Sequence, residues 1–369
     1  MNRFARRGDR DEAHRGPHGP SLRRSLARRR GPDRRPDDED PMSRRSLRAV
    51  REVFPIRGVF RISRGARTES VVVTATIAEG DARGRGECVP YPRYGESVDS
   101  VLAQIEDARA AIEAGAGRAE LQSLLPAGAA RNALDCALWD LEAKRAGKPV
   151  WELAGLPAPR PLTTAFTLSV DEPPAMEAAA RAAAGRPLLK IKLTGDGDLA
   201  RVQAVRRGAP AARLIVDANE AWTATHYESF ARELAGLGVE MIEQPLPAGK
   251  DAGLSTVEHP VPVCADESCH DTSSLAEIGA RYEAINIKLD KAGGLTEALR
   301  LRDAARAAGR RVMVGCMLGT SLAMAPAILV AQGAEWVDVD GPLLLARDRD
   351  PGLVYAGSTV SPPTTALWG

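Results

Sequence analysis

Several things are scarce or absent in this sequence, and each absence excludes a class of protein. No apolar run approaches the roughly 18 residues that a membrane-spanning helix needs. The five cysteines are an odd number without a C-x-x-C pair, and the five histidines show no zinc-type spacing. The net charge of +1 gives no reason to expect nucleic acid or an anionic membrane as a partner. We therefore expect a cytoplasmic protein in a reducing compartment, and any metal site should be built from oxygen.

The beginning of the chain differs in composition from everything after it. Residues 1–41 mix Arg, Asp, Gly and Pro with almost no aliphatic side chains, so they cannot bury enough apolar surface to fold. A nucleic-acid-binding or targeting tail is one interpretation, but the segment lacks the apolar core of a secretory signal, and its acidic residues argue against a transit peptide. We expect a disordered, Arg-rich extension over residues 1–45, with Met42 as an alternative start.

The next part of the chain has the pattern of a small α+β domain. Two strands, one Gly/Pro/Tyr loop and two amphipathic helices are predicted in this order: residues 49–65, 68–80, 84–97, 97–115 and 128–147. The second helix should end at Gly147, because Pro149 follows it. The Pro-rich segment 155–161 reads as a joint, so this domain is predicted to span residues 46–158.

After the joint, short apolar strands alternate with helical segments. Eight strands are predicted, at TTAFTLSV, LLKIKL, RLIVDAN, VEMIEQP, VPVCADES, AINIKLD, RVMVGCM and EWVDVD. Such alternation is typical of βα units around a parallel sheet. Eight strands over about 180 residues favour a TIM-like barrel, and no G-x-G-x-x-G motif supports a dinucleotide fold. The sequence therefore predicts an α/β barrel over residues 159–341.

Charged residues recur at the C-terminal ends of five successive predicted strands. They are Lys192, Asp217, Glu243, Asp266 and Lys288, each separated from the next by one βα unit. In a barrel these ends meet at one mouth, where such enzymes carry their active sites. A single carboxylate is more often a helix cap or an ion-pair partner, but three in register on consecutive strands predict a site. Three converging carboxylates need a hard cation, and oxygen ligands alone favour Mg²⁺.

The lysines at these strand ends suit proton transfer. A lysine is a base only when neutral, so its pKa of about 10.4 must fall toward roughly 7 to 8. Burial, Mg²⁺ and a second cation all lower it, and Lys190, on the same side of the strand as Lys192, could be that cation. Snorkelling to solvent is the alternative for Lys190. Lys192 and Lys288 on opposite sides of one carbon would invert it: one removes the α-proton, Mg²⁺ stabilises the enediolate, and the other returns a proton.

The motifs KIK, DAN, EQP, DES and NIKLDKAGG together resemble the muconate-lactonizing branch of the enolase superfamily, over nearly all of the chain from residue 48 onward. The resemblance implies a (β/α)7β barrel over residues 159–341 and an α+β capping domain that residues 342–369 complete. It implies that the Mg²⁺ ligands are Asp217, Glu243 and Asp266. It also implies that the second lysine of KIK, Lys192, and the lysine of NIKLD, Lys288, are the two acid/base residues.

Within that branch, DVDGP resembles the D-x-D signature of dipeptide epimerases. There the two carboxylates, here Asp338 and Asp340, bind the α-ammonium group of the substrate, although a lone D-x-D is more often a capped loop. Three stretches are similar to the L-Ala-D/L-Glu epimerases: GECVPYPRYGES, LLPAGAARNALDCALWDLEAK, and GCML followed by TS. In these an arginine of the capping domain holds the glutamate side chain; Arg64 matches it, with Arg61 and Arg67 as alternatives.

Weaker matches complete the expected site. Thr167, Lys190 and Cys316 match substrate-contacting positions, although packing usually explains a lone Thr or Cys. Many dipeptide epimerases carry an acidic residue after the GCM strand, where this chain has LGTS, so specificity could include N-acylated glutamate.

The expected function is Mg²⁺-dependent epimerisation of a small dipeptide, L-Ala-Glu first, in murein peptide metabolism. The alternatives are an N-acylamino-acid racemase and an o-succinylbenzoate synthase-like lyase, whose substrates have no ammonium group for Asp338 and Asp340. A sugar-acid dehydratase would need a histidine at a strand end, and none falls there. The sequence leaves homo-oligomerisation open.

Overall fold

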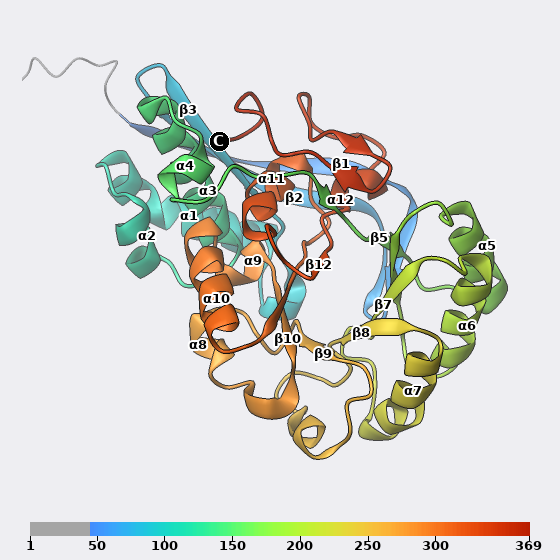
Figure 1. Cartoon of the computed structure of the whole chain (residues 1–369). Coiled ribbons are helices and arrows are strands. Elements are labelled where there is room, and N and C mark those ends of the chain that lie inside the picture. Colours follow the sequence, from blue (N-terminus) through green and yellow to red (C-terminus); the bar gives the residue numbers. More distant parts are fainter. Residues whose placement is uncertain (1–44) are drawn as a thin grey trace, which may run out of the picture. The chain divides into compact units, whose positions relative to one another are not determined.

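The structure, a computed structural model, describes residues 45–369 (Figure 1). The predicted Arg-rich extension lies outside the described residues except for Arg45. In this part of the chain, no helix is long and apolar enough to cross a membrane. All five cysteines fall within it, and each is a free thiol.

An antiparallel sheet and the helices that follow it make up the first part of the fold. Its strands β1 (Ser46–Ile62), β2 (Gly65–Glu79) and β3 (Ala82–Cys88) pair in that order. A 3₁₀ turn and four helices follow: η1 (Pro92–Tyr94), α1 (Val98–Glu113), α2 (Arg118–Leu124), α3 (Ala129–Ala146) and α4 (Val150–Leu153). Helices α1 and α3 confirm the two predicted helices. The first begins at a capping box on Ser97, and the second ends at Gly147, which is left-handed as a C-terminal glycine usually is.

The pattern predicts a loop over residues 84–97, and this is wrong for residues 84–88. Residues 82–88 form β3, which pairs with β2 along its whole length. Glycine weakens an isolated strand, so the pattern around Gly84 and Gly86 did not indicate one. In the fold they are needed, because a Cβ on Gly84 would lie 2.0 Å from Ala137 O and a Cβ on Gly86 would lie 2.1 Å from Ala133 O. The missing side chains let α3 pack directly on the strand.

Eight parallel strands form a second, curled sheet, one from each predicted segment. They are β5 (Phe166–Leu168), β6 (Leu188–Lys192), β7 (Arg213–Asp217), β8 (Val239–Glu243), β9 (Val263–Ala265), β10 (Ala284–Ile287), β11 (Arg311–Val314) and β12 (Trp336–Val337). Neighbours in the chain are neighbours in the sheet, and Ala165 N donates to Val337 O at 2.7 Å, so the last strand returns beside the first. The predicted TIM-like barrel is confirmed.

Helices connect these strands. The longer ones are α5 (Pro173–Ala182), α6 (Asp198–Gly208), α7 (Ala224–Gly236), α10 (Leu295–Ala307) and α11 (Ser321–Val330). They lie outside the curled sheet (Figure 1). Shorter elements are η2 (Ala252–Thr256), α8 (Thr272–Leu275), η3 (Gly279–Arg281), α9 (Leu289–Ala292) and α12 (Gly341–Leu344). The loops at the carboxyl ends of the strands are thus free to carry polar groups.

One apolar layer closes the bottom of the barrel. It takes one buried side chain from each strand or from the residue next to it: Ala165, Leu188, Ile215, Met241, Cys264, Ala284, Met313 and Trp336. Layers of this kind fill the interior of barrels, so the centre is a packed core and not a pore. We call this layer the floor. Because it excludes water from below, groups placed above it are reached only from the mouth.

The end of the chain returns to the first sheet. Strands β13 (Tyr355–Ala356) and β14 (Thr359–Val360) pair with β4 (Leu162–Thr163). Ala346 N donates to Pro55 O at 2.8 Å, so this segment lies beside β1. Arg349 then bridges two strands of the sheet, with its Nη2 2.8 Å from Glu52 Oε2 and 2.7 Å from Glu87 Oε2. The C-terminal segment is thereby bound to the first sheet through a buried ion pair.

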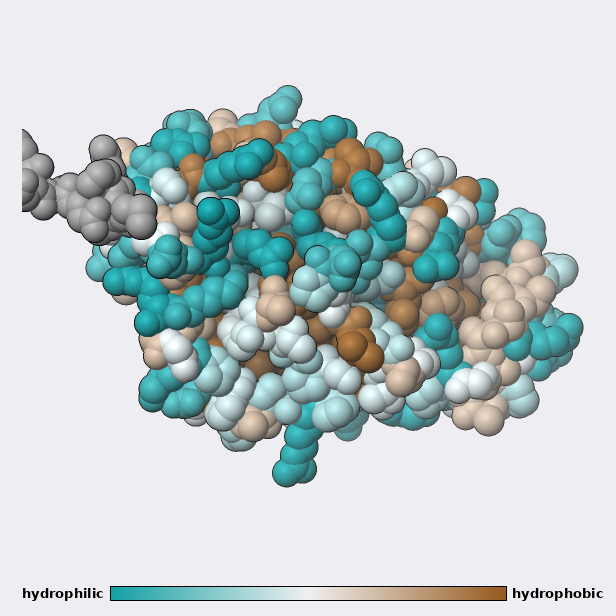
Figure 2. Space-filling view, turned by 90° about the horizontal axis from the view of Figure 1, so that it is seen from above, coloured by the Kyte–Doolittle hydropathy of each residue, from teal (hydrophilic) through white to brown (hydrophobic). Residues whose placement is uncertain are grey.

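The surface seen in Figure 2 is largely hydrophilic, with apolar residues in small separate groups. Among the described residues, the exposed large hydrophobic side chains are Val59, Leu124 and Val354. Scattered apolar residues of this kind are normal on a folded protein and do not mark a binding face.

Gly86→Ala should destabilise the protein, because its Cβ would overlap the α3 backbone. Overpacking of this kind typically costs about 1–3 kcal/mol of unfolding free energy, which urea denaturation followed by circular dichroism would measure. Gly236→Ala is the control: this glycine ends α7, has nothing within 4 Å of a Cβ, and should give no loss. Equal stabilities of the two variants would contradict the close packing of α3 on β3.

Candidate active site

Two inward-facing layers above the floor carry the charged residues. Side chains on a strand alternate in direction, so the residue two positions beyond each floor residue also points inward. These residues are Thr167, Lys190, Asp217, Glu243, Asp266, Asn286, Gly315 and Asp338. Two positions further along, Lys192, Lys288 and Asp340 line the pocket. The period of two that marks the strands therefore brings the predicted site residues together.

Lys190 lies at the centre of the first charged layer. Its Nζ is 2.8 Å from Asp338 Oδ2, 3.3 Å from Asp217 Oδ2 and 2.7 Å from Glu243 Oε2. The last contact is not aligned as a hydrogen bond, so Glu243 Oε2 has a charge partner and no donor. Lys190 is only 1% exposed, so the snorkelling alternative is wrong. One ammonium group is shared by three buried carboxylates.

The two proposed acid/base lysines each contact one carboxylate closely. Lys192 faces Asp217 in the β6–β7 register, and its Nζ lies 2.6 Å from Asp217 Oδ2. Lys288 follows β10 directly, and its Nζ lies 2.7 Å from Asp266 Oδ2. Lys291, to which the sequence analysis gave no role, also contacts Asp266. Its Nζ lies 2.6 Å from the other carboxylate oxygen, Oδ1.

Burial and charge pairing act against each other in this cluster. At Lys190 and Lys288 burial favours the neutral amine, but the surrounding carboxylates outweigh it and raise both pKa values. Burial also works against the charged forms of Asp217 and Asp266, yet the neighbouring lysines lower their pKa values. At Glu243 burial and the repulsion of Asp217 prevail and raise the pKa. The carboxylates thus hold Lys190 and Lys288 as ammonium groups in this arrangement.

The D-x-D pair follows β12 at the mouth of the barrel. Asp338 Oδ2 contacts Lys190, while its buried Oδ1 has no hydrogen-bond partner. Asp340 Oδ2 accepts a hydrogen bond from Thr167 N at 2.6 Å. Burial and the repulsion of Asp338 raise the pKa of Asp340 to about 7. Two buried carboxylates, of which only Asp338 contacts a cation directly, form an environment that favours binding of a further positive charge.

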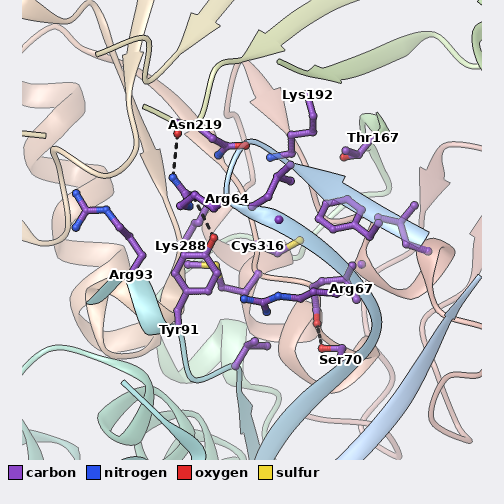
Figure 3. A pocket seen from close by; sticks show the side chains of 18 of the residues that line it. Arg64, Arg67, Ser70, Tyr91, Arg93, Thr167, Lys192, Asn219, Lys288 and Cys316 are labelled. Carbon is purple, nitrogen blue, oxygen red and sulfur yellow. Dashed lines mark hydrogen bonds between the residues drawn. The ribbon is translucent and has the colours of Figure 1, made fainter. Parts of the chain in front are cut away.

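Arg64 extends over the pocket from the turn between β1 and β2 (Figure 3). Its Nη1 donates to Asn219 O at 3.1 Å, and its Nη2 donates to Tyr91 OH at 3.0 Å. Nη2 also lies 2.8 Å from Glu267 Oε1, and burial together with Asp266 raises the pKa of Glu267 to about 7 despite this pairing. Arg64 is therefore anchored to the loops beyond the barrel strands.

The structure separates the three candidate arginines. Arg64 and Arg67 both line the pocket, and the Arg67 guanidinium lies 5.5 Å from the centre of the Tyr91 ring. Arg61 instead lies 3.7 Å from Asp171, and both side chains are about half exposed. The alternatives that remain are Arg64 and Arg67.

A pocket of about 410 Å³ opens above these groups. It brings together most of the predicted residues, with Asp217 and Glu243 buried beneath it; those lining it are Arg64, Thr167, Lys190, Lys192, Asp266, Lys288, Cys316, Asp338 and Asp340. An apolar wall faces them, made of Ile56, Phe60, Ile62, Met317, Leu318 and Leu344. This volume suits a small ligand.

The sequence motifs contain further site residues to which the sequence analysis gave no role. Asn219 and Gln244 lie next to the strand-end carboxylates and adopt left-handed φ angles of 44° and 35°. The amide oxygen of Gln244 accepts from Asp266 N at 2.8 Å and from Ser268 N at 3.0 Å. Strained backbone of this kind persists where the surroundings hold it. In DAN, EQP and DES a polar residue follows the carboxylate within two positions, and this feature of the sequence could have indicated these further site residues.

Comparison with known proteins agrees with this geometry. Residues 175–365 match the model for the enolase C-terminal domain-like family, and residues 44–155 match the N-terminal domain of mandelate racemase / muconate lactonizing enzyme. The chain belongs to the enolase superfamily.

Two relatives in this superfamily differ in the reaction that their names state. The L-Ala-D/L-Glu epimerase of Escherichia coli is 48% identical over 84% of this chain and 98% of its own length. The N-acetyl-D-glutamate racemase of a Pseudoalteromonas species is 45% identical over 81% of this chain and 95% of its own.

Solved structures of the same superfamily superpose closely. An enolase family member from Agrobacterium tumefaciens with homology to dipeptide epimerases, bound to sodium and L-Ala-L-Glu, is 57% identical with a TM-score of 0.87, over 88% of this chain and all of that one. A dipeptide epimerase from Methylococcus capsulatus, complexed with Mg and L-Arg-D-Lys, is 30% identical with a TM-score of 0.81, over 87% of this chain and 98% of that one.

The donor atoms at the mouth fit a hard cation. Within residues 45–369, the buried side-chain oxygens without a hydrogen bond belong to Asn219, Glu243, Glu267, Asn286 and Asp338, all at or next to the charged layers. The three strand-end carboxylates are buried and offer only oxygen, the donor that Mg²⁺ prefers. Across the same range, no three His, Cys, Asp or Glu side chains are grouped so that they could hold a metal ion, and lysine ammonium groups contact Glu243 and Asp266. The donor atoms present therefore match the chemistry of Mg²⁺.

Lys190→Met should destabilise the protein strongly, because it leaves three buried carboxylates without their shared cation. Removing one partner of a buried ion pair typically costs about 3–5 kcal/mol of unfolding free energy. Urea denaturation at a fixed Mg²⁺ concentration would measure this loss. Lys148→Met is the control, since Lys148 pairs with Glu152 in an exposed position and its loss should change little. Similar losses in both variants would refute the central role of Lys190.

Proposed function

We propose that this protein is a Mg²⁺-dependent dipeptide epimerase that inverts the α-carbon of the C-terminal residue, with L-Ala-Glu as the first substrate to test. The observation that carries this proposal is the placement of Lys192 and Lys288. Lys192 is the last residue of β6 and Lys288 follows β10; these strands are four apart in an eight-stranded barrel, and both lysines line one pocket. Strands four apart stand on opposite sides of such a barrel, which is what two-base inversion of a single carbon requires.

The proposed roles follow from charge and position. Asp338 and Asp340 bind the α-ammonium group of the dipeptide, and Arg64, with Arg67 as the alternative, binds the side-chain carboxylate of the C-terminal residue. These contacts at both ends orient the α-carbon between the lysines. One lysine takes the α-proton, and the other delivers a proton to the opposite face. The floor and the apolar wall keep bulk water away from the reacting carbon.

Asp217, Glu243 and Asp266 are the proposed Mg²⁺ ligands. Bound Mg²⁺ would compete with the ammonium groups for these carboxylates, lower the pKa of the nearby lysines, and stabilise the negative charge that develops on the substrate's own carboxylate. The contact with Asp266 therefore explains why Lys288 is protonated in this arrangement. Competition by Mg²⁺ for the same carboxylate would weaken that contact and favour the neutral amine.

The proposed setting is the cytoplasm and the metabolism of murein peptides. Five unpaired thiols among the described residues support a reducing compartment. The likeness to an L-Ala-D/L-Glu epimerase over nearly the whole length of that relative supports the murein assignment.

A second candidate is racemisation of an N-acylated glutamate on the same scaffold. The 45% identical relative named N-acetyl-D-glutamate racemase favours it, as does LGTS after the GCM strand, where many dipeptide epimerases carry an acidic residue. An N-acyl group has no positive charge, so Asp338 and Asp340 would then lie beside a neutral amide. Burial and mutual repulsion already disfavour negative charge on this pair of carboxylates, so a cationic substrate is the better match.

Deuterium exchange separates the two candidates. In D₂O with Mg²⁺, the Glu α-proton of L-Ala-L-Glu should exchange, as followed by the loss of its NMR signal, while N-acetyl-L-glutamate should exchange far more slowly. Lys192→Ala and Lys288→Ala should each abolish inversion, because each removes the proton donor or acceptor on one face. Exchange of N-acetyl-L-glutamate without exchange of the dipeptide would establish the racemase instead.

Asp340→Asn should raise KM for L-Ala-L-Glu while kcat changes less. Losing one charged acceptor for the ammonium group corresponds to roughly 10- to 100-fold weaker binding. The carboxamide oxygen can still accept from Thr167 N, so the local backbone is preserved. Steady-state kinetics with the dipeptide and with N-acetyl-L-glutamate provide the comparison. An unchanged KM for the dipeptide would remove the D-x-D pair from substrate binding.

A further inference from the structure

The segment directly after Lys288 has little to stabilise it locally. Lys288 is the N-cap of α9, a helix of only four residues, which is too short to be stable on its own. Its last residue is Ala292, and Gly293 and Gly294 follow with positive φ angles of 77° and 114°. The conformation that aims Lys288 must therefore come from contacts with other parts of the fold.

Helix α3 supplies contacts at the far end of this segment. The Arg131 guanidinium donates from Nη2 to Ala292 O at 2.7 Å and from Nε to Gly293 O at 3.1 Å, which satisfies carbonyls at the end of α9. A Cβ on Gly293 would lie 2.4 Å from Arg131 Nε, so only glycine allows this approach. A residue of the first part of the fold thus caps the helix that begins at Lys288.

The contact nearest to Lys288 is made by Asp290. Its Oδ1 accepts two hydrogen bonds, from Asn132 Nδ2 at 2.9 Å and from Val89 N at 3.0 Å. Asn132 belongs to α3, and Val89 leads into the loop with Tyr91 and Tyr94, which line the pocket. All three bonded groups are on buried residues. One carboxylate oxygen therefore joins the lysine segment, helix α3 and the pocket loop.

A contact from inside the barrel completes the fixation. Lys291, one residue beyond Asp290, donates to Asn286 O at 2.9 Å and contacts Asp266 Oδ1. The α9 segment is thereby held on its inner side by the barrel and on its outer side by α3. Lys192 has a different support, because it lies within strand β6 and is paired there with Asp217 of β7, whereas Lys288 lies beyond the end of β10.

We propose that Asp290 and Asn132 are positioning residues for Lys288 and that their contact serves one half of the reaction only. This inference rests on the proposed two-lysine function. Neither Asp290 nor Asn132 lines the pocket itself; they act through the backbone that carries the lysine. Loss of the contact should impair proton removal from the epimer that Lys288 serves and spare removal from the epimer that Lys192 serves.

Exchange measured separately for each epimer tests this directly. Inversion requires both lysines in either direction, whereas loss of the α-proton from one epimer requires only the lysine on its face. Lys192→Ala and Lys288→Ala, with L-Ala-L-Glu and L-Ala-D-Glu in D₂O, first identify which epimer each lysine deprotonates. Asn132→Ala should then slow exchange of the Lys288 epimer by roughly 10- to 100-fold, the range expected for a base displaced by about 1 Å, and leave the other epimer within about twofold.

Matched variants separate positioning from general damage to the interface. Thr296→Val removes the hydrogen bond that Trp139 Nε1 makes to Thr296 Oγ1 at 3.0 Å, on the same face of α3 but further from Lys288, and should not favour either epimer. Asp290→Ala should reproduce the asymmetry, and Asp290→Asn, which keeps an oxygen for both donors, should recover most of the rate. If Asn132→Ala fails to fold by circular dichroism, Asn132→Ser replaces it, because its shorter side chain also loses the contact.

The outcomes are distinct. Equal slowing of both epimers in the Asn132 variant, or the same asymmetry in Thr296→Val, overturns the inference and leaves the proposed function standing. Absence of exchange from both dipeptide epimers in the unaltered protein overturns the proposed function and this inference together.

Discussion

The structure depends on mutual neutralisation of charges buried inside the barrel. Above the apolar floor, strand alternation places Lys190 next to Asp217, Glu243 and Asp338, none of which could remain there alone at a tolerable cost. The ion pairs make the charged layers compatible with a folded core, and they also keep carboxylates, ammonium groups and oxygens without hydrogen bonds together at one opening. Stability and chemistry are thus set by the same contacts.

The parts of the site that the sequence predicts are those governed by a single strand. Within one strand, apolar and charged residues alternate up to the strand end, and this pattern is local. It therefore allowed Lys192, Asp217 and Glu243 to be placed from the sequence alone. Strand β3 was missed because its glycines serve a helix that lies elsewhere in the chain. The strand propensity of neighbouring residues cannot reveal a packing requirement that comes from a helix elsewhere in the chain.

Contacts between distant segments were equally invisible. Arg64 and Glu267 are 203 residues apart, and Asn132 and Asp290 are 158 apart, so no spacing rule connects them. The sequence showed that arginines occur near the turn after β1, but only the fold distinguishes Arg61, which faces Asp171, from the two that face the pocket. Which long side chain reaches a site depends on how the sheets meet, and that is a property of the assembled chain.

The bridge from Arg349 to Glu52 has a consequence for how the chain is made. These residues are 297 positions apart, and the buried Glu87 carboxylate depends on the same guanidinium. During synthesis the first sheet emerges well before Arg349, so Glu87 gains this charge partner only 262 residues later. Contacts of such sequence separation slow folding and leave partly assembled states exposed. The first sheet thus precedes, by most of the length of the fold, the residue that completes its buried ion pair.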